Sequence, residues 1–159
     1  MERIYHHIHQ IQELYNGGSW LDESFAKKLK NETDHTAFQQ PIAGVHSVAE
    51  IVWHCIYWRN TLIKRMEGDV GYRDRTVEEF NFLPNDRLKS LGWQNLLDQF
   101  EASQQKIIGL LDAQKDEFLD DIYFENDTYD HLISGIIQHD SYHLGQIGLV
   151  QKIRSVLLK

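Results

Sequence analysis

Apolar residues recur at intervals of three and four along four segments of the chain, and this spacing limits its fold more than any other feature. An α-helix completes a turn in about 3.6 residues, so this spacing gathers apolar side chains on one helical face. A half-buried strand would alternate apolar and polar residues, and no useful length of the sequence does so. The four segments lie at residues 4–29, 47–66, 93–111 and 128–154. Because four helices with one apolar face each can close around a shared core, the sequence predicts an all-α four-helix bundle.

Local signals predict where these helices begin and what connects them. Residues 47–50, Ser-Val-Ala-Glu, form a capping-box pattern that satisfies exposed backbone amides at a helix start. The first segment is expected to break at the glycine pair 17–18 and to resume with Ser19 as its cap, while Ser90 can cap the third segment. Residues 68–89 contain glycine, proline and several charges, which predicts an irregular connection.

Composition and charge narrow the class of protein. At 159 residues, of which 42% are hydrophobic, the chain is long enough for a core of its own, so we predict one domain over residues 1–159. The formal net charge of −8 argues against nucleic-acid binding, which depends on cations that neutralise phosphates. No apolar run approaches the roughly 20 residues needed to cross a bilayer, so no membrane association is expected. Because Cys55 is the single cysteine and no secretory signal is recognisable, we expect a cytoplasmic protein.

Three polar side chains fall on the face of the fourth segment that should be buried. On a helical wheel centred on Ile136, Asp140 and His143 lie within roughly 40° of the centre, and His139 lies at roughly 60°. A buried ionisable group without a partner costs several kcal/mol of folding free energy, so something must compensate. Metal coordination is one solution, and a hydrogen-bonded polar network is the other.

The spacing of three histidines favours the metal. His139 and His143 are four residues apart, so both imidazoles can reach one ion from adjacent turns of the same helical face. With nine histidines in the chain, such a pair also arises by chance. A third histidine, His54, lies at the edge of the apolar face of the second segment, from which it can face the fourth helix. We therefore predict His54, His139 and His143 as metal ligands.

Asp140 is the candidate catalytic residue. It could be a fourth ligand, a general base, or an acceptor that fixes the orientation of a ligand histidine. Adjacent helical residues diverge by about 100°, so Asp140 and His139 do not easily chelate the same ion, and the orienting role is favoured. Glu50 is an alternative orienting carboxylate, although its capping role is favoured, and Cys55 is interpreted as a small buried apolar residue.

Three stretches of the sequence resemble the DinB-like superfamily, whose members are four-helix proteins often described as metal-dependent hydrolases. Residues 135–147, GIIQHDSYHLGQI, resemble its C-terminal signature. Residues 44–54, GVHSVAEIVWH, are similar to its first ligand region, and residues 15–20, YNGGSW, to its opening segment. The resemblance covers nearly the whole chain.

The resemblance implies a DinB-like bundle that forms a homodimer and binds a divalent metal ion through His54, His139 and His143. The ion would be zinc or nickel in most members and iron in some. Members are also similar to thiol transferases that use low-molecular-weight thiols, and to maleylpyruvate isomerases. The name does not imply a DNA polymerase.

Three functions can be weighed from these predictions. Three imidazoles leave a coordination position open for a water or a substrate, as in catalytic sites, which favours a metal-dependent hydrolase or thiol S-transferase acting on a small molecule. The alternative is a non-catalytic metal-binding or ligand-binding protein of the stress response. A zinc protease with a His-x-x-x-His motif ranks last, because Asp140 follows His139 where such proteases have glutamate.

Overall fold

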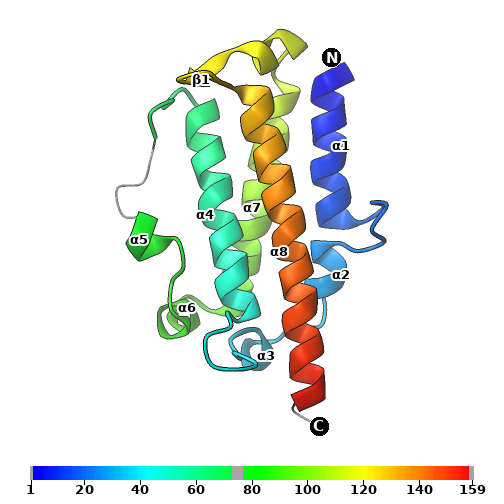
Figure 1. Ribbon diagram of the computed structural model, residues 1–159, viewed down its shortest axis with the longest axis vertical. Coiled ribbons are helices and arrows are strands. Elements are labelled where there is room, and N and C mark those ends of the chain that lie inside the picture. Colours follow the sequence, from blue (N-terminus) through cyan, green and yellow to red (C-terminus); the bar gives the residue numbers. More distant parts are fainter. Residues whose placement is uncertain (1, 73–76, 158–159) are drawn as a thin grey trace.

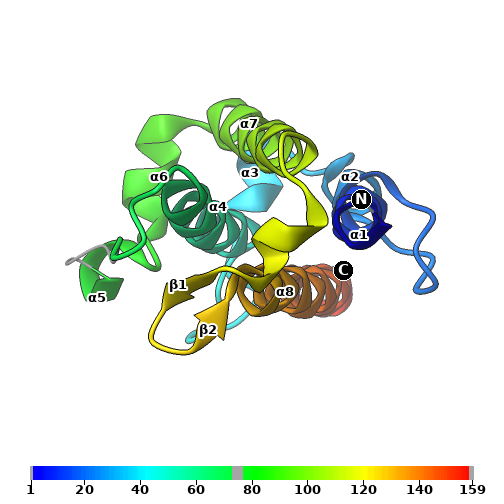
Figure 2. The ribbon, with the colours of Figure 1, turned by 90° about the horizontal axis from the view of Figure 1, so that it is seen from above.

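Four long helices run side by side in the computed structural model, which describes residues 2–72 and 77–157 (Figure 1). Seen from above, α4 and α1 lie on opposite sides of the bundle, and each is flanked by α7 and α8 (Figure 2). The helices are α1 (Glu2–Asn16), α4 (Val48–Met66), α7 (Trp93–Asp112) and α8 (Tyr129–Leu157). This architecture confirms the predicted all-α four-helix bundle. Within the described residues, no helix is both long and apolar enough to cross a membrane.

The order of the helices requires a long crossover on one side of the bundle. Following the colours of Figure 1, α1 and α8 run downwards whereas α4 and α7 run upwards. The chain must therefore return along the bundle between the end of α4 and the start of α7. The prediction of a wholly irregular connection over residues 68–89 is wrong, because two short helices form there; residues 73–76 lie outside the described part. The two helices are α5 (Val77–Phe80) and α6 (Asn85–Leu91).

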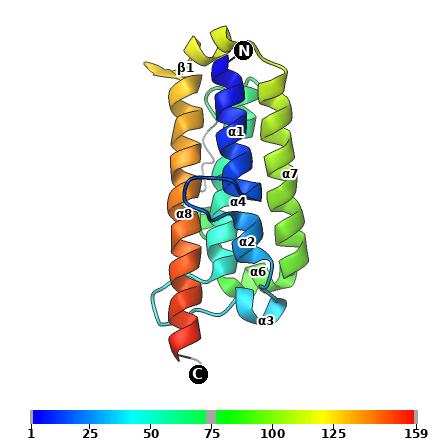
Figure 3. The same ribbon diagram turned by 90° about the vertical axis from the view of Figure 1, so that its right-hand side faces the viewer.

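Short elements close both ends of the bundle. Helices α2 and α3 lie below α1, and a turn of 3-10 helix and a small hairpin lie at the upper end (Figures 1 and 3). The two strands pair antiparallel, Ile122 with Thr128, and are too short to show an alternating pattern in the sequence. The remaining bounds are α2 (Phe25–Leu29), α3 (Asp34–Ala37), η1 (Asp116–Asp120), β1 (Ile122–Phe124) and β2 (Asp127–Thr128).

The helix starts agree with the sequence signals at one position and differ at two. At α4, the Ser47 hydroxyl accepts from the Glu50 amide at 3.2 Å, and the Glu50 carboxylate accepts from the Ser47 amide at 2.7 Å, which confirms the capping box. Ser19 does not cap a helix, because α2 begins after Ser24, whose hydroxyl accepts from an amide in its first turn. Ser90 lies inside α6 and therefore does not cap α7.

A buried polar layer separates two apolar clusters of the core. One cluster fills the lower half of the bundle and includes Val52, Phe100 and Ile147. The other fills the upper half and includes Leu62 and Ile133. Between them lie polar side chains that are at least nine-tenths buried: Arg59, Ser103, Gln104, Asp140 and His143. Since burial of polar groups is costly, this layer is the part of the core that needs a further explanation.

Candidate metal centre

The structure brings together the three histidines that the sequence analysis selected. His54 projects from α4, and His139 and His143 project from α8, which packs beside it. The ring centroids are 4.9 Å apart for His54 and His139, 4.6 Å for His54 and His143, and 4.3 Å for His139 and His143. One ring nitrogen from each histidine lies within 4.8 Å of the other two, so the group could hold a metal ion.

Each of the three rings has an acceptor beside its Nδ1 atom. The Nδ1 of His54 is 3.1 Å from the backbone carbonyl oxygen of Asn81, and that of His139 is 3.4 Å from Asp140 Oδ1. The Nδ1 of His143 is 2.7 Å from Gln146 Oε1. Because these oxygens can only accept, each Nδ1 is assigned the proton and each Nε2 is left with a lone pair. Such Nδ1 partners typically orient a histidine that binds metal through Nε2.

The distance between the Nε2 atoms of His54 and His139 indicates whether a cation fits the centre. They lie 3.0 Å apart, and with both Nδ1 atoms protonated, two lone pairs face each other. That arrangement is unfavourable by itself but is expected of two ligands of one ion. Two nitrogens bound tetrahedrally to zinc at about 2.0–2.1 Å would lie roughly 3.3 Å apart. The donor set and its geometry therefore fit a divalent transition metal, with at least one coordination position left over.

Burial favours the neutral, metal-binding form of His54 and His143. Burial lowers the pKa of His54 from 6.5 to about 4, and the neighbouring His143 and His139 lower it further, against the hydrogen bond to Asn81. Burial and the charge of His139 also lower the pKa of His143. At neutral pH, a metal ion would thus have little competition from protons for these two ligands.

Asp140 connects the histidines to the buried polar layer. Its Oδ2 accepts from Arg59 Nε at 2.8 Å, and its Oδ1 faces His139 Nδ1. Burial would raise the pKa of Asp140, but the Arg59 guanidinium and the hydrogen bonds from His139 and Arg59 outweigh it and lower that pKa. With both oxygens engaged, this geometry favours the orienting role over a general base. The catalytic role of Asp140 stays a prediction.

Arg59 and Gln146 are components of the centre that the sequence analysis missed. Arg59 is 1% exposed, and its guanidinium carbon lies 4.0 Å from the centroid of the Phe100 ring. Both Arg59 and Gln146 had a local signal in the sequence. Arg59 is a charge that interrupts the apolar face of α4 four residues after Cys55, and Gln146 follows His143 by one helical turn.

The crossover supplies a wall of the centre that the sequence analysis also missed. The Phe82 ring stacks on His54 with centroids 4.0 Å apart. Trp53 Nε1 donates to the Phe80 carbonyl at 2.7 Å, and Trp58 Nε1 donates to Asn81 Oδ1 at 3.0 Å. These contacts fix residues 80–82 against α4 and cover His54. No spacing in the sequence could reveal them, because they join an irregular segment to a helix.

Cys55 belongs to the same region but does not form a second centre of its own. Its ligand atom and those of His139 and Asp140 lie within 4.8 Å of one another. The facing atoms of His139 and Asp140, however, are already paired with each other. Burial, and next the Asp140 carboxylate, raise the pKa of the Cys55 thiol well above its usual value. This agrees with the interpretation of Cys55 as a small buried side chain.

Comparisons with known proteins agree with this fold. A family model described as the DinB superfamily matches residues 21–147, which is well over half of the chain. A crystal structure described as a conserved protein from Enterococcus faecalis is similar in fold, with a TM-score of 0.62 and 17% sequence identity. The similarity covers 96% of this chain and 92% of that chain. Among curated proteins, none matches the sequence significantly.

Proposed function

Because the chain belongs to the DinB superfamily, we propose that it is a cytoplasmic, metal-dependent enzyme that acts on a small molecule. The observation that carries the proposal is the arrangement of His54, His139 and His143. Their Nδ1 atoms face acceptors, and the Nε2 atoms of two of them face each other at 3.0 Å. A hydrogen-bonded network alone would pair donors with acceptors. This arrangement therefore supports metal binding over a purely structural polar network.

The three histidines would hold a divalent ion, zinc or nickel by preference and iron as a further choice. When bound, the ion would supply Lewis-acid polarisation and would lower the pKa of a coordinated water or thiol. Asp140 would keep the His139 ring in place. The His139 side chain is 23% exposed, whereas His54 and His143 are buried, so a substrate would approach from the side of His139. Phe82 would keep water from the face of the His54 ring on which it stacks.

Metal content is the first test of the proposal. Purified wild-type protein should contain about one divalent ion per chain by elemental analysis, and His143→Ala should lose it, because two imidazoles rarely retain an ion. The exposed His9→Ala is the matched control and should keep the wild-type content, since the His9 side chain is 70% exposed on α1. Wild-type metal content in His143→Ala would rule out the proposed ligand set.

The reaction class is the second test. A hydrolase adds water across a bond of the substrate, whereas a thiol S-transferase joins a low-molecular-weight thiol to an electrophile. Electrophilic esters and epoxides should be incubated with and without thiols, and the products identified by mass spectrometry. Turnover that requires the thiol supports the transferase: an epoxide would open to a hydroxy thioether, and an ester would give a thioester and release its alcohol. Turnover without thiol supports the hydrolase. Turnover that survives metal removal in either case would contradict the proposal.

A homodimer is also part of the proposal, and the outer face of α8 supports it. Tyr142, Leu149 and Val156 are 64%, 59% and 61% exposed and lie seven residues apart, so they form one apolar stripe. A second copy of the chain could cover this stripe. Light scattering should give twice the chain mass for the wild type and the single mass for Leu149→Lys. A monomeric wild type would contradict the dimer without affecting the metal centre.

A further inference from the structure

A pocket of about 280 Å³ opens beside His139, between α4, α8 and the small hairpin. Its size lies just below the range of about 300–1,000 Å³ for pockets that take drug-sized ligands, so it suits a smaller compound. The lining residues are Trp58 from α4, Tyr123 and Asp127 from the hairpin, and His131, Leu132, Gly135, Ile136 and His139 from α8. His139 thus connects this pocket to the histidine centre.

The walls of the pocket favour a ring-shaped apolar group. Trp58 and Tyr123 contribute two aromatic rings, and Leu132 and Ile136 contribute aliphatic side chains. The Trp58 ring is fixed by its hydrogen bond to Asn81. The hairpin side is fixed as well, because the guanidinium carbon of Arg65 lies 5.1 Å from the centroid of the Tyr123 ring. Aromatic walls that are held in place suit the flat face of an aromatic ligand.

The acidic and basic side chains that line the pocket are not balanced. Among the described residues that line it, Asp127 provides a carboxylate, and there is no lysine or arginine. The Asp127 side chain is half exposed, and its nearest ionic contact is His131 Nε2 at 4.0 Å. Asp127 therefore gives the hairpin side of the pocket a negative charge, which would attract a cation.

From these contacts we propose that the pocket binds the body of the substrate, and that this body is a small aromatic compound with a positively charged end. The ring would lie between Trp58 and the aliphatic side chains of α8, and the cation would lie near Asp127. The link to catalysis rests on the proposed function, because only a metal at the histidines gives His139 a reacting group nearby. The binding itself depends on the pocket alone.

Gly135 allows the pocket to be filled without replacing a proposed metal ligand. A Cβ atom added there meets nothing within 4 Å, so Gly135→Leu should fold and place its side chain over the pocket. Gly145 lies on the same helix, has the same open surroundings and does not line the pocket, so Gly145→Leu is the matched control. The probes are tryptamine and indole, titrated calorimetrically at pH 8.

Wild type and Gly145→Leu should bind tryptamine more tightly than indole, because Asp127 attracts the ammonium group of tryptamine. Gly135→Leu should bind tryptamine at least about tenfold more weakly, because the ring loses its buried surface. Asp127→Asn should reduce the preference for tryptamine over indole by up to about fivefold, as expected for an exposed ion pair. Binding that is absent in the wild type, or equal in the two leucine variants, overturns the proposal. Metal content measured on the same samples separates that result from a failure of the metal centre.

Discussion

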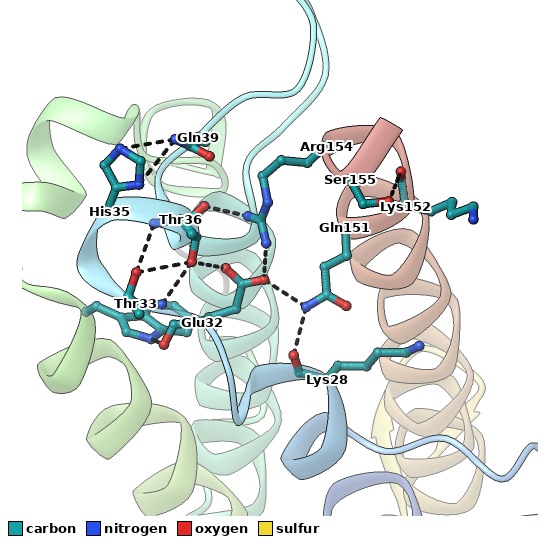
Figure 4. A network of polar contacts seen from close by, with 11 residues as sticks. Lys28, Glu32, Thr33, His35, Thr36, Gln39, Gln151, Lys152, Arg154 and Ser155 are labelled. Carbon is teal, nitrogen blue, oxygen red and sulfur yellow. Dashed lines mark hydrogen bonds and ion pairs between the residues drawn. The ribbon is translucent and has the colours of Figure 1, made fainter. Parts of the chain in front are cut away.

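Helix α8 carries two buried polar clusters, and they compensate the cost of burial in different ways. The lower cluster surrounds Glu32, which joins α8 to the segment between α2 and α3 (Figure 4). Its carboxylate accepts from Arg154 Nη2 at 2.5 Å, from Gln151 Nε2 at 2.8 Å and from the Thr36 hydroxyl at 2.7 Å. Every one of these contacts pairs a donor with an acceptor, so the cluster is complete within the chain.

The upper cluster, formed by the three histidines and Asp140, is only partly complete. Asp140 is paired with Arg59, as Glu32 is paired with Arg154. The Nε2 atoms of His54 and His139, by contrast, bring acceptor against acceptor when the protons are assigned to both Nδ1 atoms. The difference separates a cluster that holds the fold together from one that is arranged for a ligand. Within the upper cluster, Asp140 is paired within the chain, whereas the histidines are arranged for a ligand.

The largest effect on stability should come from Asp140→Ala. This change leaves the Arg59 guanidinium buried without its carboxylate, and breaking a buried pair in this way costs about 3–5 kcal/mol of unfolding free energy. Urea unfolding of metal-free protein measures the loss. The double variant Arg59→Met, Asp140→Leu should recover most of it, since it removes both charges. A loss below about 1 kcal/mol in Asp140→Ala would mean that the Phe100 ring is enough to hold Arg59.

Glu32→Gln should have a smaller effect on stability and none on metal content. The amide keeps the size of the side chain but removes the charge that pairs with Arg154. A hydrogen bond to a charged group contributes about 1.5–3 kcal/mol to the free energy of unfolding. Urea unfolding and elemental analysis test the two halves of this prediction. Glu67→Gln is the control at an exposed ion pair with Lys106 and should change stability little. A loss of metal in Glu32→Gln would remove the distinction between the clusters.

The two clusters also differ in how far the sequence could predict them. His139 and His143 are found by their spacing alone, and His54 by its place beside an apolar face, because both signals are local to one helix. Glu32 and Arg154 are 122 residues apart, so only the packing of α8 against the lower segment reveals their pairing. Long-range pairs of this kind leave no periodic signal in either segment.

The limits of the helix predictions have a similar physical origin. The long helices follow from apolar faces that persist over several turns, and the start of α4 follows from the capping box at Ser47. Helices α5 and α6 are too short for such a face, and α6 is fixed by tertiary contacts instead. Leu88 is fully buried, and the Asn85 side chain accepts from the Ser47 hydroxyl at 2.7 Å. Asn81 and Phe82 reach the centre through the same crossover, which explains why they were missed.

Acid should weaken the upper cluster before the lower one. The pKa of His54 is about 4 in the folded protein against 6.5 ordinarily, so between these values the unfolded chain binds a proton that the folded chain does not. The stability of metal-free protein should therefore fall as the pH falls from 6.5 towards 4. Hydrogen bonds hold the pKa of Glu32 below 4.5 despite its burial, so its contribution is lost only at lower pH, as the pH falls through that lowered pKa.

Urea unfolding at pH 7.5, 5.5 and 4.5 tests this order. His54→Phe removes one titrating imidazole and keeps a ring of similar shape beside Phe82, so its stability should decline less steeply over this range than that of the wild type. Glu32→Gln should decline as steeply as the wild type between pH 7.5 and 5.5. Equal slopes for wild type and His54→Phe would show that burial does not hold His54 neutral.

The smallest effect should come from Gln146→Ala, and a second glutamine on the same helix provides the comparison. Gln146 Oε1 accepts from His143 Nδ1 at 2.7 Å, so its loss should leave the ring free to rotate and weaken metal affinity by about tenfold, with little change in stability. Gln151, also partly buried, donates to the Lys28 carbonyl and to Glu32 at 2.7 and 2.8 Å. Gln151→Ala should therefore lower stability and leave metal affinity unchanged. Chelator competition measures the metal affinity of both variants, and urea unfolding measures their stability. If the two variants lose metal affinity equally, Nδ1 pairing does not orient His143, and the difference between the clusters rests on the histidines alone.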